Sequence, residues 1–442
     1  MIGQDKRQRI NLKVYGCQQV LINQDLDLKA LLEFVCIEAN SLINCGIYYS
    51  RQLYFKTGKL PSKADLHKEI GTLQKNKHYQ ALYSDTAQQI LTGVAESFKS
   101  FVGLLKGIKN GTVAQKPKLP NYRTSGGLAV ATFTGRSIKL KNGMLRFPLG
   151  SLVKTWFGVD SFYLPMPSNL DFKDIREVRI LPRNRCFYAE FVYKTNTTII
   201  ELDKSKVLGI DHGIDNWLTC VSNTGTSFIV DGLHLKSINQ WYNKSVANIK
   251  EGKPQGFWSN RLAAITEKRN RTMRDAVNKA ARIVINHCID NKIGTVVFGW
   301  NEGQKDGADM GKKNNQKFVQ IPTAKLKRRI AQLCEQYGIV FVETEESYTS
   351  KSSFIDNDFL PKFGEKPEGW KSSGLRITRG QFQTSTGIKI NADCHGAVNI
   401  IKKVAAIFKF DLSRVSRGCL SQPKKVRLWT LQKSPSLQRG EA

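Results

Sequence analysis

The middle of the chain carries three short apolar runs separated by turn residues. The first, residues 207–210, leads directly into Asp211 at the start of a turn. Two more runs follow at residues 217–221 and 227–231, and the sequence Asn-Thr-Gly between them is typical of a tight hairpin turn. Short apolar runs bounded by turn residues favour strands over helices. The pattern therefore predicts an antiparallel meander whose first strand ends in a carboxylate, a suitable position for a metal ligand.

Downstream of this meander, apolar residues recur at helical spacing and then alternate between helix and strand patterns. We expect helices at residues 235–248 and 263–289, a strand at 294–298, a helix at 324–337 and a strand at 339–342. Together with the meander, these elements give the βββαβαβ order of an RNase H-like fold. A last helix is predicted from Ala392, with Asp393 in its first turn.

The first two hundred residues follow a different pattern. Alternation over residues 9–15 predicts a strand, and helical spacing over residues 28–108 predicts a helical bundle. Short alternating runs between residues 128 and 193 predict a small barrel that the bundle interrupts. The expected domains are two parts of the barrel at 1–27 and 111–200, a helical lobe at 28–110, an RNase H-like α/β domain at 201–404, and a basic, largely flexible tail at 405–442.

The net charge of the chain indicates which class of partner it binds. Among 442 residues, 68 are Lys or Arg and 37 are Asp or Glu, which gives a formal net charge of +31. An excess of this size indicates a polyanionic partner, with nucleic acid as the first candidate. No apolar run approaches the roughly 18 residues of a membrane-spanning helix, and the first residues show no signal-peptide pattern. We therefore expect a soluble, cytoplasmic protein that does not act at a membrane.

Two motifs give the chain a family resemblance. The stretch Gly209-Ile-Asp-His-Gly-Ile-Asp-Asn216, followed far downstream by Asn391-Ala-Asp-Cys-His-Gly-Ala-Val-Asn-Ile400, resembles the first and third motifs of the RuvC-like, RNase H-fold nuclease of the TnpB family. These proteins are transposon-encoded relatives of the type V CRISPR effectors. Further stretches that look like this family extend over most of the chain, at residues 91–99, 116–120, 145–148 and 344–351.

The resemblance implies both a fold and an activity. The fold would be a wedge-type barrel with a helical recognition lobe inserted in it, followed by a RuvC-like nuclease domain. The activity would be that of an endonuclease that binds a guide RNA from the transposon end, recognises a short motif beside its target and cuts double-stranded DNA. The alternative is a nuclease-impaired, RNA-guided DNA-binding protein that acts by occupancy. A transposase in its own right ranks below both.

Asp211 and Asp393 are the first two predicted catalytic residues. Phosphodiester hydrolysis in this fold uses two divalent ions roughly 4 Å apart, held by carboxylates. Oxygen ligands suit Mg²⁺ or Mn²⁺. Taken singly, Asp211 could be a turn residue and Asp393 an acidic residue favoured by a helix N-terminus. Their joint occurrence in two motifs favours metal ligation, and it also favours the endonuclease over the inactive binder.

The third carboxylate has to come from an unusual position. Most of the family end the fourth strand in a glutamate, but Gly299 stands there in this chain. Glu302 lies just beyond that strand, and Glu345 and Glu346 lie at the end of the next one. Side chains alternate along a strand, so only one of these two should face Asp211. We expect Glu346, within about 7 Å of both aspartates, with Glu345 and then Glu302 as alternates. If no glutamate approaches, the site is impaired.

Other polar and aromatic residues are weaker candidates. We interpret His212 and His395 as structural, because neither has a second histidine nearby that would complete a site. Aromatic rings can stack on bases, and a basic helix face can contact the phosphate backbone, although core packing and a solvated face are the alternatives. On these grounds the candidate nucleic-acid contacts are Trp300, Tyr348, Arg271, Arg274 and Lys279.

No structural zinc is expected. Most TnpB-like proteins carry a four-cysteine zinc ribbon between their second and third motifs, yet no cysteine lies between Cys334 and Cys394. Ser352 and Ser353 stand where the first pair of ligands would be. The nine cysteines of the chain are widely and irregularly spaced, so we expect free thiols and no disulfide framework.

Overall fold

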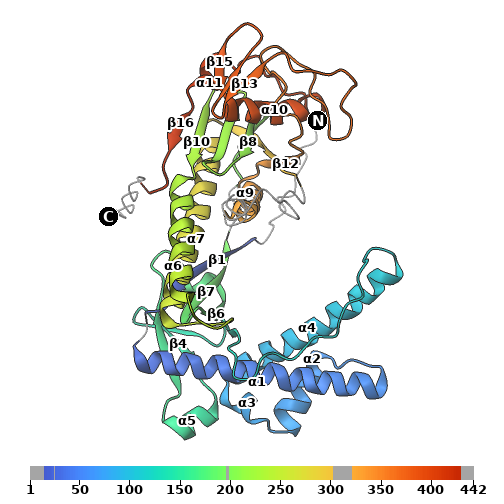
Figure 1. The fold of residues 1–442 in the computed structure, drawn as a ribbon. Helices are drawn as coiled ribbons and strands as arrows, with labels where there is room; N and C mark the ends of the chain where they lie inside the picture. The colour runs from blue at the N-terminus through green and yellow to red at the C-terminus, as the bar shows by residue number, and fades with distance from the viewer. Residues whose placement is uncertain (1–13, 24, 196–198, 302–320, 430–442) are drawn as a thin grey trace, which may run out of the picture. The chain divides into compact units, whose positions relative to one another are not determined.

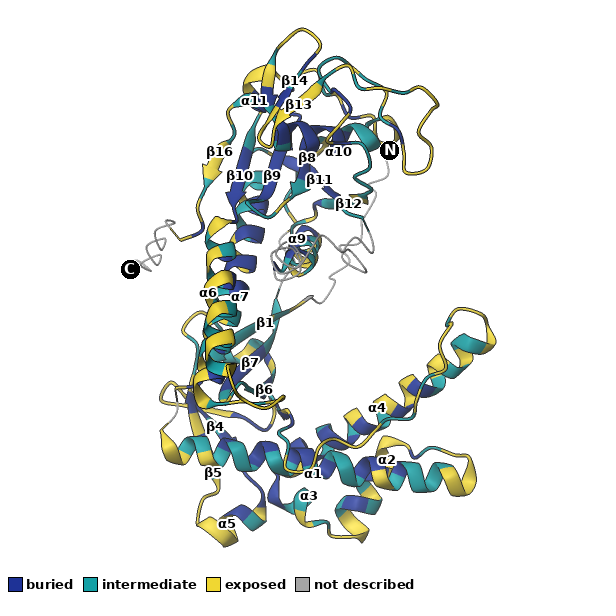
Figure 2. Ribbon diagram, in the orientation of Figure 1, coloured by how far each residue is buried: buried dark blue, intermediate teal, exposed yellow. Residues whose placement is uncertain are grey.

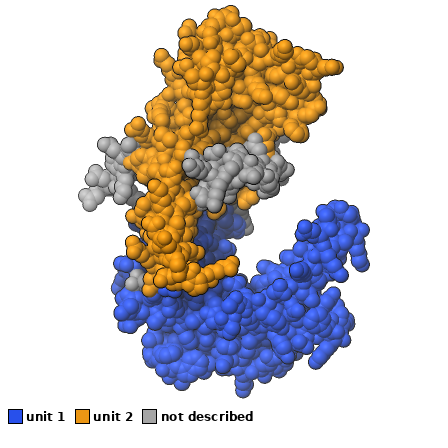
Figure 3. All heavy atoms as spheres, in the orientation of Figure 1, with its two compact units in different colours: residues 1–196 blue, residues 197–442 orange. Residues whose placement is uncertain are grey.

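The computed structural model describes residues 14–23, 25–195, 199–301 and 321–429. The chain divides into two compact units, unit 1 with residues 1–196 and unit 2 with residues 197–442 (Figures 1 and 3). The finer division into barrel, lobe and nuclease domain stays a prediction. Each unit has its own hydrophobic core and is described by itself below.

The elements of unit 1 are, in chain order, β1 (Val14–Leu21), α1 (Leu26–Thr57), α2 (Lys63–Leu66), η1 (His67–Leu73), α3 (Lys77–Ala81), α4 (Ser84–Lys109), β2 (Ala131–Thr134), β3 (Lys139–Lys141), β4 (Met144–Pro148), α5 (Ser151–Phe157), β5 (Ser161–Pro165), η2 (Phe172–Asp174), β6 (Ile175–Arg183) and β7 (Cys186–Thr195).

The strands of unit 1 form two antiparallel sheets, with the orders β1-β7-β6-β2 and β3-β4-β5. The first strand pairs with the last, from Val14 opposite Thr195 to Leu21 opposite Tyr188. Helices α1 to α4 lie in the chain between β1 and β2. Helices are thus inserted among the strands as expected, but the described strands form two sheets and not a single closed barrel.

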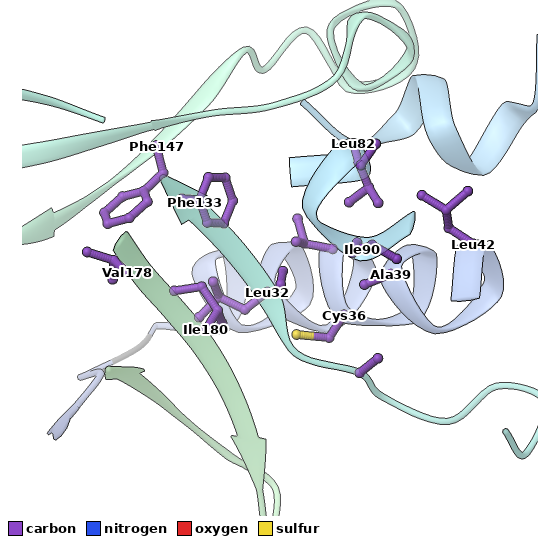
Figure 4. Packing of buried hydrophobic residues seen from close by; sticks show 14 of the residues in the cluster. Leu32, Cys36, Ala39, Leu42, Leu82, Ile90, Phe133, Phe147, Val178 and Ile180 are labelled. Carbon is purple, nitrogen blue, oxygen red and sulfur yellow. The ribbon is translucent and has the colours of Figure 1, made fainter. Parts of the chain in front are cut away.

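The core of unit 1 forms where α1 meets α4 and the sheets (Figure 4). Leu32, Cys36 and Ala39 recur at helical spacing along α1 and are fully buried. They belong to one cluster with Phe133 of β2 and Phe147 of β4, whose rings meet edge-on with centroids 5.2 Å apart. Figure 2 shows buried segments recurring along α1, in agreement with the helix predicted from the spacing of apolar residues.

Helix α1 is unusually apolar for its length. It begins where the Asp25 side chain accepts a hydrogen bond from the Leu28 N–H at 2.7 Å, and it ends at Gly58 in the left-handed conformation. By length and composition alone it could cross a membrane, which differs from the expectation that the chain has no such run. Of its most apolar 18-residue window, 44% is buried inside the protein. That burial gives the helix a core-packing role.

The elements of unit 2 are, in chain order, β8 (Asp203–His212), β9 (Asn216–Ser222), β10 (Ser227–Asp231), α6 (Leu233–Lys250), α7 (Asn260–Asp290), β11 (Ile293–Gly299), α9 (Thr323–Tyr337), β12 (Val340–Thr344), β13 (Leu375–Thr378), β14 (Gln381–Gln383), β15 (Lys389–Asn391), α10 (Ala392–Phe408), α11 (Arg417–Ser421) and β16 (Lys424–Val426).

The main sheet of unit 2 has the order β12-β11-β8-β9-β10-β16. Strands β8, β9 and β10 form the predicted antiparallel meander, while β11 runs parallel to β8 and β12 runs parallel to β11. The predicted βββαβαβ order is therefore present, with α6 and α7 together as the first helical connection and α9 as the second. Strands β13, β14 and β15 form a separate small sheet before α10.

Helices cover both faces of the main sheet. Leu208 and Ile210 of β8 belong to a cluster with residues of α7 and α9, whereas Val207 belongs to a cluster with residues of α10. Successive side chains of a strand point to opposite faces, so Asp211 lies on the same face as Val207. The end of β8 and the start of α10 therefore meet on one face of the sheet.

Residues 405–429 contain helical and strand elements, within the stretch 405–442 whose composition predicts a largely flexible tail. Helix α10 continues to Phe408, and β16 pairs in parallel with β10, with Phe228 opposite Lys424. Leu420 and Leu428 are buried in the cores on the two faces of the sheet. The excess of Lys and Arg in this stretch dominates its composition, so the few apolar residues that pack against the sheet did not lead to a prediction of structure. Residues 430–442 lie outside the described residues.

Candidate functional site

Asp211 lies at the carboxyl end of β8, on the face that α10 covers. Two glycines allow strand and helix to approach closely. A Cβ on Gly209 would lie 2.5 Å from the carbonyl oxygen of Ala397, and a Cβ on Gly396 would lie 2.8 Å from Oδ2 of Asp211. A larger residue at either position would force the two elements apart. The two motifs thus hold the Asp211 carboxylate against the first turns of α10.

Asp393 approaches the same place from α10. The Asn391 side chain caps this helix and accepts a hydrogen bond from the Asp393 N–H at 3.0 Å. The Asp393 carboxylate accepts a hydrogen bond from Nδ2 of Asn216 at 2.6 Å and pairs with the Arg376 guanidinium at 3.4 Å. Asp211 and Asp393 line one pocket, so the structure brings the two predicted aspartates together.

The Glu346 side chain occupies the space beside Gly299. A Cβ on Gly299 would lie 2.8 Å from Oε1 of Glu346 and 2.9 Å from its Cγ. Gly299 ends β11, and Glu346 follows the end of the parallel neighbour β12 by two residues. The Glu346 N–H donates a hydrogen bond to Oδ1 of Asn301 at 2.9 Å, which ties the two strand ends together. A carboxylate from the next strand therefore reaches the place where a side chain on β11 would begin.

The other two glutamate candidates do not share this position. Glu345 pairs with Lys403 and accepts a hydrogen bond from the Ser347 N–H at 2.6 Å. Glu302 lies outside the described residues. Oxygen atoms of Asp211 and Glu346 and a nitrogen of the neighbouring His212 all lie within 4.8 Å of one another.

Asp393 is not a member of this three-residue cluster in the part of the chain that the structure describes. The expected separation of Glu346 from Asp393 stays a prediction, although both carboxylates act on Asp211. Burial raises the pKa of Asp211 well above its usual value, and the charges of Glu346 and Asp393 raise it further. Carboxylates that crowd together in this way favour the binding of a cation, which would lower the cost of their repulsion.

His212, the last residue of β8, also belongs to this cluster. Its Nδ1 lies 2.9 Å from Oε1 of Glu346. Its ring packs beside Trp300 and Phe298, with centroid separations of 5.3 and 5.9 Å. A single histidine after the motif aspartate gave no signal of this contact, because Glu346 is distant in the sequence. His395 is buried within α10, where its Nε2 accepts a hydrogen bond from the Phe354 N–H at 3.1 Å.

A pocket of about 350 Å³ opens beside the two aspartates. Part of its wall is the hairpin of β13 and β14, which contributes Arg376 and Arg379. Arg379 pairs with Asp215 at 3.2 Å, and Asp215 also accepts a hydrogen bond from Lys236 at 2.7 Å. Neither arginine is predicted from the sequence, since they belong to no recognised motif and only the fold brings them to the aspartates.

The predicted aromatic contacts lie near the cluster. Trp300 follows β11 and is half-buried, with Nζ of Lys327 4.3 Å from the centre of its ring. Tyr348 adopts a positive φ of 64° in the turn after Glu346, and its ring lies 5.7 Å from that of Trp370. Neither arrangement tests a role in binding nucleic acid, so these two assignments stay predictions.

The predicted basic ridge lies along α7. Arg274 pairs with Glu267 at 2.7 Å, and Lys279 pairs with Asp275 at 2.8 Å. Arg271 is exposed. Two of the three side chains thus already have acidic partners on their own helix, while contact of this ridge with a phosphate backbone stays a prediction.

Two aspartates accept hydrogen bonds across residues 353–385, the segment in which most TnpB-like proteins carry a zinc ribbon. Asp358 accepts hydrogen bonds from the N–H of Ser353 at 2.7 Å and the N–H of Ser373 at 3.0 Å. Asp356 accepts hydrogen bonds from the hydroxyl of Ser353 at 2.5 Å and that of Ser385 at 2.6 Å. Two of these bonds connect stretches that lie 15 and 29 residues apart in the chain, which is the task that a metal performs in a ribbon.

Comparisons with known proteins identify similar families. A family model described as a probable transposase, OrfB_IS605, matches residues 190–303, and one described as the Cas12f1-like TNB domain matches residues 324–400. No curated protein matches the chain.

The chain also resembles solved structures in its fold. The chain is similar to a Cas12f1–sgRNA–target DNA complex, with 14% identity and a TM-score of 0.54, over 85% of this chain and 83% of that one. It also matches the mini-RNA-guided endonuclease CRISPR-Cas_phi3, with 10% identity and a TM-score of 0.41, over 89% of this chain and 92% of that one. The first similarity shows a fold of the Cas12 effector type.

Proposed function

This chain belongs to the TnpB-like family, and we propose that it is an RNA-guided DNA endonuclease encoded by a transposable element. One observation carries the proposal. The Glu346 carboxylate stands beside Asp211, in the space that Gly299 leaves open. The chain therefore retains a third acidic side chain, supplied by the segment after β12 instead of by β11. An acidic site maintained from a new position favours a working nuclease over a protein that only occupies its target.

Asp211, Glu346 and Asp393 would hold the divalent ions, Mg²⁺ or Mn²⁺. The fit is supported by Oε1 of Glu346, which is buried and has no hydrogen-bond partner among the described residues. An unsatisfied buried carboxylate oxygen is costly unless a cation or another donor satisfies it. Ions bound there would activate a water molecule and stabilise the leaving oxygen of the phosphodiester.

Arg376 and Arg379 would bind the phosphodiester in the pocket. Both line the pocket, and both now pair with carboxylates, Arg376 with Asp393 and Arg379 with Asp215. A guanidinium matches the geometry of phosphate oxygens in bidentate contacts. When ions neutralise Asp393, Arg376 would become available to the substrate. These contacts would orient the phosphate beside Asp211.

The partners that we propose are a guide RNA from the transposon end and a double-stranded DNA target. The net charge of +31 suits a chain that neutralises many phosphates. The similar Cas12f1 protein was solved with its single-guide RNA and target DNA. In this chain, as in RNA-guided nucleases generally, base pairing would select the target and the protein would contact mainly the backbone and a short adjacent motif.

The test is co-expression of the full chain with the DNA that flanks its gene, followed by sequencing of any RNA that copurifies. A DNA duplex that matches this RNA, placed beside a randomised motif, is then incubated with the complex and Mg²⁺. We expect cleavage of a subset of these duplexes. Binding without cleavage would instead establish the inactive, occupancy-based binder, and the absence of a defined RNA would refute RNA guidance.

A further inference from the structure

His212 offers a ligand that an all-carboxylate metal site does not have. Its Nδ1 and Oε1 of Glu346 are 2.9 Å apart, yet neither atom has a hydrogen-bond partner among the described residues. The His212 side chain is only 9% exposed, and that of Glu346 is 13% exposed. Two buried polar atoms therefore lie close together without the alignment of a hydrogen bond. A cation bound between them would satisfy both.

The spacing of these atoms fits ligands of one ion. Adjacent ligands of an octahedral ion with bonds of about 2.1 Å lie about 3 Å apart. The separation of 2.9 Å between Nδ1 and Oε1 agrees with this value. An Asp211 oxygen completes a set of three atoms within 4.8 Å of one another. The set consists of two carboxylates and one imidazole.

The fold holds the imidazole in place. His212 is the last residue of β8 and lies opposite Leu218 of β9. Its ring packs against Trp300 and Phe298, which follow or belong to the neighbouring strand β11. A ring fixed on rigid elements presents its nitrogen without a further loss of side-chain freedom when an ion binds.

We propose that His212 is a metal ligand through Nδ1, together with Asp211 and Glu346, and that the ion bound there is preferentially a transition metal such as Mn²⁺. Mg²⁺ prefers oxygen ligands, whereas an imidazole nitrogen strengthens the binding of first-row transition ions. The inference rests on the proposed function, since the ion concerned would be the one used in cleavage. It adds a nitrogen ligand, and therefore a metal preference, to that site.

The test is pulsed electron paramagnetic resonance of Mn²⁺ bound to the full chain, freed of nucleic acid. The protein is prepared once with ¹⁴N-histidine and once with ¹⁵N-histidine, so that any nitrogen coupling is assigned to imidazole. We expect a directly bound histidine nitrogen in the wild type and its loss in His212→Gln. Mn²⁺ bound without such a coupling would overturn the inference, as would a protein that binds no Mn²⁺.

A matched control is His78→Gln, because Nδ1 of His78 also lies close to a glutamate, 2.7 Å from Glu38, but in unit 1. This variant should keep the nitrogen coupling. Calorimetric titrations should show that His212→Gln weakens Mn²⁺ binding by at least about tenfold and Mg²⁺ binding much less. An unchanged ratio of the two affinities would contradict the proposal. The nitrogen coupling is measured without any substrate, so a protein with the coupling but without RNA-guided cleavage would refute only the proposed function.

Discussion

The Glu346 carboxylate and a side chain at Gly299 would occupy the same space, since a Cβ on residue 299 would lie 2.8 Å from Oε1 of Glu346. The same Cβ would lie 2.4 Å from Cδ1 of Ile400. The glycine is therefore the condition that allows Glu346 to reach Asp211. A glutamate at the end of β11 and a glutamate after β12 exclude each other unless the surrounding side chains rearrange.

This exclusion predicts the outcome of exchanging the two positions. Glu346→Gln should lower the cleavage rate at least about a hundredfold, because it removes a charged metal ligand. Gly299→Ala should lower the rate as well, although it removes no charge, because its methyl group displaces the carboxylate. The single variant Glu346→Gly should lose activity. The double variant Gly299→Glu with Glu346→Gly should regain part of the activity that Glu346→Gly loses. Single-turnover assays measure the cleavage rate of each variant. Full activity of Gly299→Ala would show that the close approach of Glu346 to residue 299 is unimportant.

The two aspartates should be needed for cleavage but not for binding. We expect Asp211→Ala and Asp393→Ala each to abolish Mg²⁺-dependent cleavage while DNA affinity changes less than about threefold, because the basic surface is unaffected. Glu345→Gln is the matched control, since Glu345 pairs with Lys403 and not with the cluster. Cleavage and filter-binding assays on the three variants separate these roles. Wild-type cutting by either aspartate variant would rule out the site.

His395 should make the protein sensitive to mild acid. Burial is the main cause that lowers its pKa from the ordinary 6.5 to about 4, so it stays neutral in the folded state. Between these values the unfolded chain binds a proton that the folded chain does not, and the free energy of unfolding therefore falls as the pH decreases. The expected loss between pH 7.5 and pH 5 is about 2 kcal/mol.

Urea unfolding of the wild type and of His395→Gln at both pH values measures this effect. The variant starts from a lower stability, but its free energy of unfolding should depend less on pH by about that amount. Equal pH dependence in the two proteins would show that His395 is already protonated in the folded state.

The aspartate and serine network should stabilise the segment before α10 without zinc. Asp358→Ala leaves the donors of Ser353 and Ser373 without an acceptor, so we expect a loss of about 2 to 3 kcal/mol in the free energy of unfolding. In Asp211→Ala, which lacks a ligand of the proposed active-site metal, a chelator should leave the melting temperature unchanged and elemental analysis should find no zinc. Stoichiometric zinc in this variant would contradict the prediction, as would a chelator-induced decrease in its melting temperature.

Much of unit 2 could be predicted because local patterns determine it. The apolar run that ends in Asp211, the tight turn after β9 and the helical spacing of α7 each specify their own element. The position of Glu346 beside the Gly299 gap could also be anticipated, because parallel neighbouring strands end at one edge of a sheet. These inferences needed only strand geometry and chain order.

The remaining features depend on contacts between distant residues. Nothing in the sequence around Arg376 indicates that it pairs with Asp393, and nothing near His212 indicates that Glu346 lies beside it. The order of residues 405–429 was missed for a similar reason. Its few apolar side chains do not predict a strand by themselves. The strand β16 forms because it pairs with β10, which is distant in the sequence.

The pairing of β16 with β10 also bears on solubility. Without β16, the backbone of β10 would lie at the edge of the sheet, with a row of unpaired N–H and C=O groups. Such an edge can recruit a strand from another molecule, and Lys424 and Lys425 now place charge beside it. A chain shortened to end after α10 would thus keep Asp211, Glu346 and Asp393 but expose a surface prone to self-association. Strand β16 thus covers the edge of β10 and should reduce aggregation, in addition to being part of the sheet.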